Sequence, residues 1–163
     1  MPPDLDHRIG ALRSASLADL ERLYAGPAAP EAPSGRYAGT FLARTAGWER
    51  CGLVLRSAVA IGFAALPFVV DFDRRVWGLA GGALRAGRFD LRAAPSRWRR
   101  TDTLAMHYDA SRLPSFVRTL LYDEVKPVGE GLLLGLGGVT HTDLFFFALR
   151  ATRAGRHARE EAA

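Results

Sequence analysis

The sequence predicts a mainly β protein, an antiparallel barrel with an N-terminal helical arm and a helix that caps the barrel. Two stretches near the C-terminal end lead to this prediction. Residues 132–136 and 144–149 are apolar on both alternating faces, and Gly135 is their one glycine. A strand with one solvated face alternates apolar and polar residues, so these two strands are expected to be covered on both sides. A small closed barrel provides that cover, because one face lines the interior and the other lies beneath a helix.

Bulk composition favours one globular domain and leaves the partner open. A chain of 163 residues can bury a substantial core, and a hydrophobic share of 48% is typical of globular proteins. The net charge of +5 permits an acidic partner or an anionic ligand without requiring one. Lys126 is the only lysine among 22 basic residues, a bias typical of GC-rich bacterial genomes. Cys51 is the only cysteine, which excludes an internal disulfide and a thiolate metal cluster.

The N-terminal arm shows a helical pattern. Apolar residues recur at helical spacing over residues 4–25, as one broken helix or two short ones. Ser16 and Asp19 match a capping box at the start of the second part. A Pro/Ala linker follows the helical pattern. The chain is therefore expected to comprise three parts: a helical arm and linker over 1–34, the barrel domain over 35–150, and a flexible tail over 151–163.

The barrel is expected to begin with a strand at residues 35–42, where Tyr37 and Phe41 share one face. Residues 47–70 form the most apolar segment and predict a buried capping helix. The uncharged part of this segment contains Pro67 and is shorter than the about 20 residues that cross a membrane. A membrane partner is therefore not expected, and a peripheral membrane anchor is the weaker alternative.

Further strands are expected at residues 76–80, 84–92 and 101–109, with a Gly-Gly turn after the first of them. A short helix is expected after Pro114, because apolar residues return there at helical spacing. The last two strands then complete the domain.

Three short motifs resemble a known family. They are Gly35-x-Tyr37-x-Gly39, Trp77-Gly78-Leu79, and the run from Tyr122 to Lys126 followed by Leu134-Gly135. With these motifs the chain resembles the lipocalin-like barrels of small bacterial proteins, in particular the GXWXG group, whose architecture is similar to calycins and nitrobindins. Tyr37 stands where that pattern has tryptophan, and the Gly-Lys-x-Phe part after Trp77 is missing. The resemblance implies a ligand cavity inside the barrel and leaves the ligand open.

Two hypotheses about function follow. In the first, the protein binds a small hydrophobic or amphipathic ligand inside the barrel. In the second, the same pocket belongs to a cofactor-independent cyclase or isomerase of bacterial secondary metabolism, acting for example on a polyketide-type substrate that it confines in a reactive conformation. The residues expected to line the cavity are Tyr37, Phe41, Trp77, Met106, Phe145, Phe146 and Phe147.

Candidate catalytic residues lie together at the end of one predicted strand. His107 and Asp109 share a face, so the carboxylate could orient the imidazole as a general base. Tyr108 points the opposite way, because side chains alternate along a strand. The competing interpretation is a strand edge with solvated polar residues.

Two charged clusters also allow two interpretations each. Glu124 and Lys126 share a face and predict a salt bridge at a strand entry, while together with Asp123 they could instead serve as pocket acid and base. The second cluster is either a solvated surface or a contact for an acidic carrier protein, and a nucleic-acid partner is not expected because the aromatic platform for single strands is missing. It consists of Arg97, Arg99 and Arg100.

No nucleotide-binding, zinc-protease or nucleophile-elbow motif occurs, so no metal and no cofactor are expected. Haem is the alternative cofactor, held by His107 or His141 in the manner of nitrobindin. The first residues carry charges and lack the apolar segment of a secretory signal, so a cytoplasmic location is expected.

Overall fold

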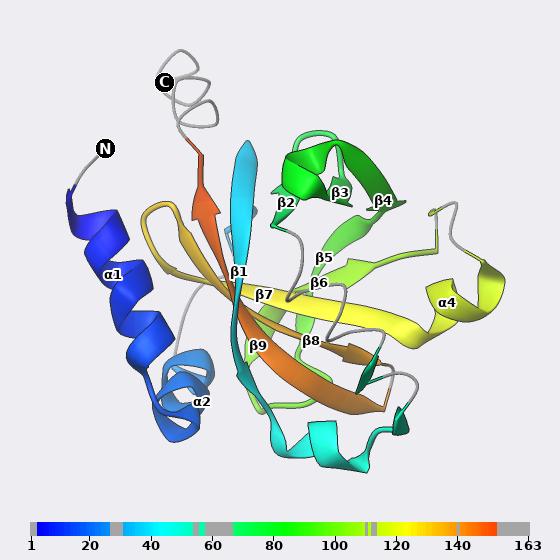
Figure 1. Ribbon diagram of the computed structural model, residues 1–163, viewed down its shortest axis with the longest axis horizontal. Coiled ribbons are helices and arrows are strands. Elements are labelled where there is room, and N and C mark those ends of the chain that lie inside the picture. The colour runs from blue at the N-terminus through cyan, green and yellow to red at the C-terminus, as the bar shows by residue number, and fades with distance from the viewer. Residues whose placement is uncertain are drawn as a thin grey trace.

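A computed structural model describes residues 3–26, 31–53, 56–57, 67–109, 111, 114–139 and 141–152. Within this part, nine strands form one antiparallel sheet that curls into a half-barrel (Figure 1). The strands are β1 (Arg36–Arg44), β2 (Phe68–Asp71), β3 (Val76–Leu79), β4 (Leu84–Arg88), β5 (Asp90–Pro95), β6 (Asp102–His107), β7 (Leu121–Gly129), β8 (Leu132–Val139) and β9 (Thr142–Ala151). The mainly β fold class is therefore confirmed.

The order of the strands across the sheet is β4-β3-β2-β1-β9-β8-β7-β6-β5. The two edge strands, β4 and β5, are consecutive in the chain and meet at Phe89, which is buried against Phe72 with ring centroids 5.8 Å apart. The stretch 84–92 is therefore two strands on opposite edges of the sheet rather than the single strand expected from its alternation. The chain itself bridges the two edges at this point.

Strands β8 and β9 lie in the middle of the sheet, and both of their faces are buried, as their apolar sequences predict. Side chains on one face join the core inside the curl, and side chains on the other face lie beneath the N-terminal helices. Phe145 and Phe147 belong to the inner core, whereas Phe146 and Leu134 belong to the outer one.

The N-terminal arm consists of α1 (Pro3–Ser14) and α2 (Leu17–Ala25), which cover the outside of the curl (Figure 1). The expected capping box is present, because the Ser16 hydroxyl accepts from the Asp19 backbone N–H at 3.2 Å and the Asp19 carboxylate accepts from the Ser16 backbone N–H. The helices bury an apolar face against β8 and β9, made of Leu5, Ile9, Leu12, Leu20 and Tyr24.

A buried polar network fastens α2 to the sheet. Glu124 of β7 is fully buried and accepts hydrogen bonds from the Tyr24 hydroxyl at 2.9 Å, the Ser96 hydroxyl at 2.6 Å and the Arg97 backbone N–H at 2.7 Å. Lys126, which is 1% exposed, donates from Nζ to the Tyr24 carbonyl at 3.0 Å. Nζ also bonds the Gly26 carbonyl and the Thr101 hydroxyl. The ammonium thus caps the C-terminal end of α2, where helix carbonyls lack partners.

The prediction of a salt bridge between Glu124 and Lys126 is wrong. The two side chains share a face of β7, but neither forms an ion pair among the described residues, because each is engaged with other groups. Burial lowers the pKa of Lys126, with nearby Asp102 opposing the shift. The network therefore works through hydrogen bonds to the helix and to the loop before β6.

The predicted capping helix over residues 47–70 is wrong at its C-terminal end, where Phe68–Asp71 form strand β2. Its N-terminal part overlaps the short 3-10 helix η1 (Ala46–Arg50), and most of its middle, residues 54–55 and 58–66, lies outside the described residues. A short apolar run fits a buried strand as well as a helix, and Pro67 favours extended backbone before β2.

Residues 121–150 hold three strands rather than the two expected, because the charged residues of β7 also lie in the sheet. The short helix after Pro114 is present as α4 (Ser115–Leu120), and a second 3-10 helix, η2 (Ala80–Gly82), occupies the expected Gly-Gly turn. None of the helices within the described ranges is long and apolar enough to cross a membrane.

Candidate functional site

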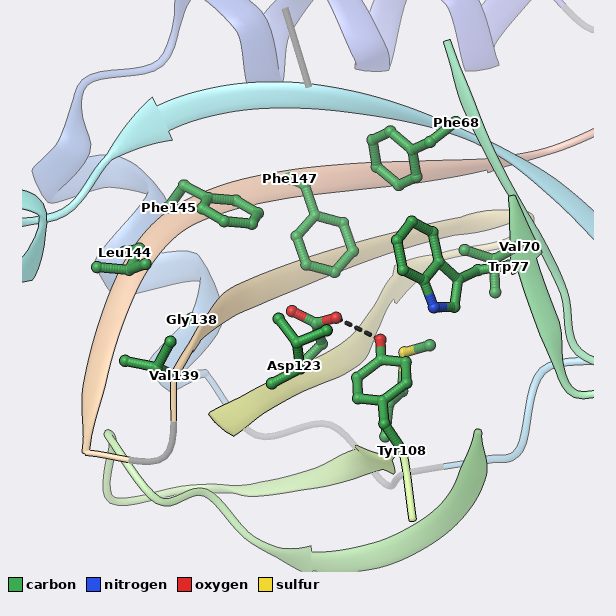
Figure 2. Close-up of a pocket in the computed structure, with 12 residues that line it drawn as sticks. Phe68, Val70, Trp77, Tyr108, Asp123, Gly138, Val139, Leu144, Phe145 and Phe147 are labelled. Carbon is green, nitrogen blue, oxygen red and sulfur yellow. Dashed lines mark hydrogen bonds between the residues drawn. The ribbon is translucent and has the colours of Figure 1, made fainter. Parts of the chain in front are cut away.

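The concave side of the half-barrel encloses a partly open cavity of about 70 Å³ (Figure 2). At about 30 Å³ of liquid volume for each water, this is room for about two waters, so a molecule as large as one ring must extend through the open side. Two polar side chains, Tyr108 and Asp123, stand among a lining that is otherwise apolar apart from the indole nitrogen of Trp77. The other lining residues are Phe68, Val70, Met106, Leu121, Gly138, Val139, Leu144, Phe145 and Phe147.

Two glycines of β8 allow the aromatic rings of β9 to lie across the sheet. Gly135 pairs with Phe147 and Gly137 pairs with Phe145 in the β8–β9 ladder. A Cβ atom on either glycine would lie 2.2 or 2.6 Å from the facing ring, which no side chain tolerates. The glycines therefore give the rings their position along the cavity wall.

Tyr108 and Asp123 form a hydrogen-bonded pair inside the cavity. The chain positions them from neighbouring strands, since Asp123 of β7 pairs with Met106 of β6 and Tyr108 follows β6. The Tyr108 hydroxyl donates to Oδ2 of Asp123 (Figure 2), and the tyrosine is 2% exposed.

Burial raises the pKa of Asp123 from 3.8 to about 6, although the bonds from Tyr108 and the Gly138 backbone N–H favour the charged form. The negative charge of nearby Glu124 adds to the rise. Burial and the charge of Asp123 also raise the pKa of Tyr108 well above 10, so the tyrosine stays a hydrogen-bond donor. The pair thus places one carboxyl that titrates near neutral pH in apolar surroundings.

We expect the Asp123→Asn variant to be more stable than the wild type above about pH 6. The folded state holds the Asp123 proton more tightly than the unfolded state, so the stability that this proton contributes is full below the unfolded pKa of 3.8 and is lost as pH rises through about 6. Two pKa units correspond to about 3 kcal/mol as an upper figure. Denaturant unfolding of both proteins between about pH 3.5 and 7.5 measures the difference, and a difference independent of pH would contradict the assignment.

Trp77 adds a third polar atom to the cavity. Its ring stands edge-on to that of Tyr108, with centroids 6.4 Å apart. Its Nε1 atom is buried and has no hydrogen-bond partner in the described part of the chain. In Figure 2 this nitrogen lies on the edge of the indole turned toward the Tyr108–Asp123 pair.

Comparisons with known proteins bear on the fold alone. No protein-family model matches the chain, and no curated protein matches it either. A crystal structure of a protein from Thermomonospora curvata is similar, with a TM-score of 0.56 over 92% of this chain and 99% of that one. The two sequences are 18% identical, so the similarity supports the barrel-like fold and says nothing of a shared activity.

The structure brings five of the sequence-predicted site residues into the cavity. These are Trp77, Met106, Tyr108, Phe145 and Phe147.

Three other residues expected in the wall lie elsewhere. Tyr37 is buried against Phe72 in the inner core, with ring centroids 5.3 Å apart. Phe41 packs behind Phe145 at 5.6 Å and is half-buried. Phe146 faces the opposite side of the sheet, where it contacts Tyr24 of α2 at 5.8 Å. Strand alternation accounts for the position of Phe146.

His107 and Asp109 lie outside the cavity lining. His107 packs edge-on against Tyr122 on the outer face of the sheet, and burial, Arg92 and Arg97 lower its pKa. Asp109 is exposed in the turn after β6. Among the three adjacent candidates, Tyr108 is the one that reaches the cavity, and its carboxylate partner there is Asp123. His141, the second histidine considered for haem, is exposed in the β8–β9 turn.

The arginine cluster is largely engaged with the protein itself. Arg99 forms salt bridges with Glu21 at 2.5 Å and Asp143 at 2.9 Å, which tie α2 to β9. The Arg97 guanidinium lies over the Tyr122 ring, 3.9 Å from its centroid. Arg100 is exposed. An acidic carrier protein as a partner of this cluster stays a prediction.

The described residues contain no group of three or more histidine, cysteine, aspartate or glutamate side chains that could hold a metal ion. The polar side-chain groups of the cavity lining, as far as the structure describes it, are the Tyr108–Asp123 pair and the Trp77 indole, and the rest of the wall is apolar.

Proposed function

We propose that the protein binds a small hydrophobic or amphipathic molecule in the cavity of the half-barrel. The observation that carries this proposal is the cavity itself, in which aromatic and aliphatic side chains surround one hydrogen-bonded polar pair, the buried Tyr108 and the half-buried Asp123. Binding sites for small molecules have this composition, because apolar contact provides affinity and a few polar groups set the orientation. The resemblance to lipocalin-like barrels, whose ligands lie inside the barrel, supports the same reading.

The wall supplies the larger share of the binding free energy. Burial of apolar surface contributes about 25 cal/mol for each Å², and the rings of Phe68, Phe145 and Phe147 offer such surface on one side of the cavity. The polar pair contributes less to the binding free energy, since its carboxyl is already hydrogen-bonded within the protein. The enclosed volume of about 70 Å³ is about half of the roughly 150 Å³ that holds a benzene molecule, so an occupant of one ring with a short substituent extends partly through the open side.

A calorimetric titration tests the proposal. We expect at least one neutral single-ring compound, from a panel that includes acetophenone, to bind with a stoichiometry of one and a negative heat-capacity change, the sign of apolar burial. A Phe147→Ala variant should keep the fold and bind with altered affinity, whereas the exposed Leu84→Ala variant should bind as the wild type does. Absence of binding by the whole panel at millimolar concentration would contradict the proposal.

A second candidate function is proton transfer, as in an isomerase or cyclase. The observation that favours it is the Asp123 carboxyl, whose pKa of about 6 suits a general base at neutral pH. Such a base would remove a proton from the carbon beside a carbonyl group and return it to another position. The neighbouring Tyr108 hydroxyl would hold the carboxylate in place.

Exchange of the side-chain CH₂ and CH₃ protons of phenylacetone in D₂O, followed by NMR, tests this second function without knowledge of the natural substrate. We expect exchange faster than in buffer, with a rate that rises with pH through about 6 as Asp123 ionises. The Asp123→Asn variant should bind the ketone and lose the exchange. Exchange equal to that in buffer would leave the protein a binder.

A further inference from the structure

We infer that the ligand carries a neutral oxygen atom that accepts a hydrogen bond from Nε1 of Trp77. This inference names the chemical class of the ligand and rests on the proposed binding function. The observation behind it is that Nε1 is buried at the cavity and lacks a partner among the described residues. A buried donor without an acceptor is unfavourable, so an occupant that supplies the acceptor removes that penalty on binding.

The neighbouring polar groups do not supply the acceptor. The Tyr108 ring contacts Trp77 edge-on, and its hydroxyl is directed at Asp123. The Asp123 carboxyl in turn accepts from Tyr108 and from the Gly138 backbone N–H. The indole N–H is therefore the one polar side-chain atom of the lining, within the described part, that an occupant must satisfy.

The charge of the site favours a neutral occupant over an ionic one. Asp123 is the only carboxyl among the described lining residues and carries most of a negative charge at neutral pH, so an anion beside it would be repelled. An ammonium group would be attracted to Asp123, but it has only hydrogen-bond donors and so offers no acceptor to Nε1 of Trp77. A ketone, ester or ether oxygen meets the indole N–H without adding a charge.

Trp98 shows that an unpartnered indole is not a site by itself. Its Nε1 is also buried without a partner, yet Trp98 packs against Tyr122 on the helix side of the sheet, away from the cavity lining. What distinguishes Trp77 is the cavity beside its nitrogen. Trp98 therefore provides a matched control for the experiment.

Four compounds of similar size separate the possibilities: ethylbenzene, acetophenone, 1-phenylethylamine and benzoate. We expect acetophenone to bind roughly tenfold more tightly than ethylbenzene to the wild type, because a hydrogen bond to a buried donor is worth about that factor. The amine and benzoate should bind more weakly than acetophenone. Affinities are compared as ratios within one protein, so that changes in cavity size cancel.

The ratio of acetophenone to ethylbenzene affinity is then measured in two variants. In Trp77→Phe it should fall to about one while ethylbenzene still binds, and in Trp98→Phe it should keep its wild-type value. Equal affinity of both compounds for the wild type, or tightest binding of the amine, would overturn the inference and leave the binding function standing. Absence of binding by all four would overturn both.

Discussion

The Glu124→Ala variant is expected to lose about 3 kcal/mol of unfolding free energy. Its carboxylate accepts three hydrogen bonds beneath α2, from the Tyr24 hydroxyl, the Ser96 hydroxyl and the Arg97 backbone N–H. Removal of the carboxylate takes the acceptor from all three donors, and an unsatisfied buried donor costs about 1–3 kcal/mol. The Tyr24 hydroxyl retains one neighbouring acceptor, Oγ1 of Thr103 at 3.1 Å. Part of this cost is recovered at Ser96 and Arg97, which are less buried than Tyr24.

Denaturant unfolding of Glu124→Ala measures this loss against Glu130→Ala, whose carboxylate is exposed in the β7–β8 turn. The control should change stability by less than about 0.5 kcal/mol. We also expect faster proteolysis of the N-terminal arm in Glu124→Ala, because the same network holds α2 on the sheet. An equal, small effect of both substitutions would show that the buried network does not stabilise the docked helix.

The second large effect is expected in binding, from the Leu121→Trp variant. Leu121 lines the cavity from the start of β7 and is half-buried, so the larger indole can enter the cavity without displacing the core. A ring of that size takes up much of the about 70 Å³, and we expect the affinity for acetophenone to fall by roughly 100-fold or more.

Thermal unfolding should show that Leu121→Trp is folded, and Leu84→Trp provides the control because Leu84 is 59% exposed on edge strand β4. The control should bind as the wild type does. Unchanged affinity in a folded Leu121→Trp protein would place the bound molecule outside the half-barrel.

The sequence predicts the parts of this fold that depend on local pattern. Burial on both faces of β8 and β9 follows from apolar residues at consecutive positions, and the capping box of α2 follows from Ser16 and Asp19. Strand β2, which follows Pro67, is harder to predict, because a short apolar run fits either a buried strand or a helix. Charged residues obscured β7, since buried strands rarely contain a glutamate and a lysine.

The candidate site depends on register, which a single sequence does not reveal. Tyr108 and Asp123 meet because β6 pairs with β7 with Met106 opposite Asp123. His107 and Asp109 appear closer in the sequence but lie outside the cavity. The sequence does contain one local signal. Asp123 lies two residues from each of the apolar Leu121 and Val125, and this spacing places its carboxyl on their face of the strand.

The central claim is that a small molecule occupies the cavity beside Tyr108 and Asp123, and Met106 allows a direct measurement. The chain has two methionines, Met1 and Met106, and Met106 lines the cavity with 2% exposure. In protein labelled with ¹³C at the methionine methyl groups, we predict that added acetophenone shifts the Met106 signal in a saturable manner. A Met106 signal that stays unchanged while calorimetry shows binding would contradict the account.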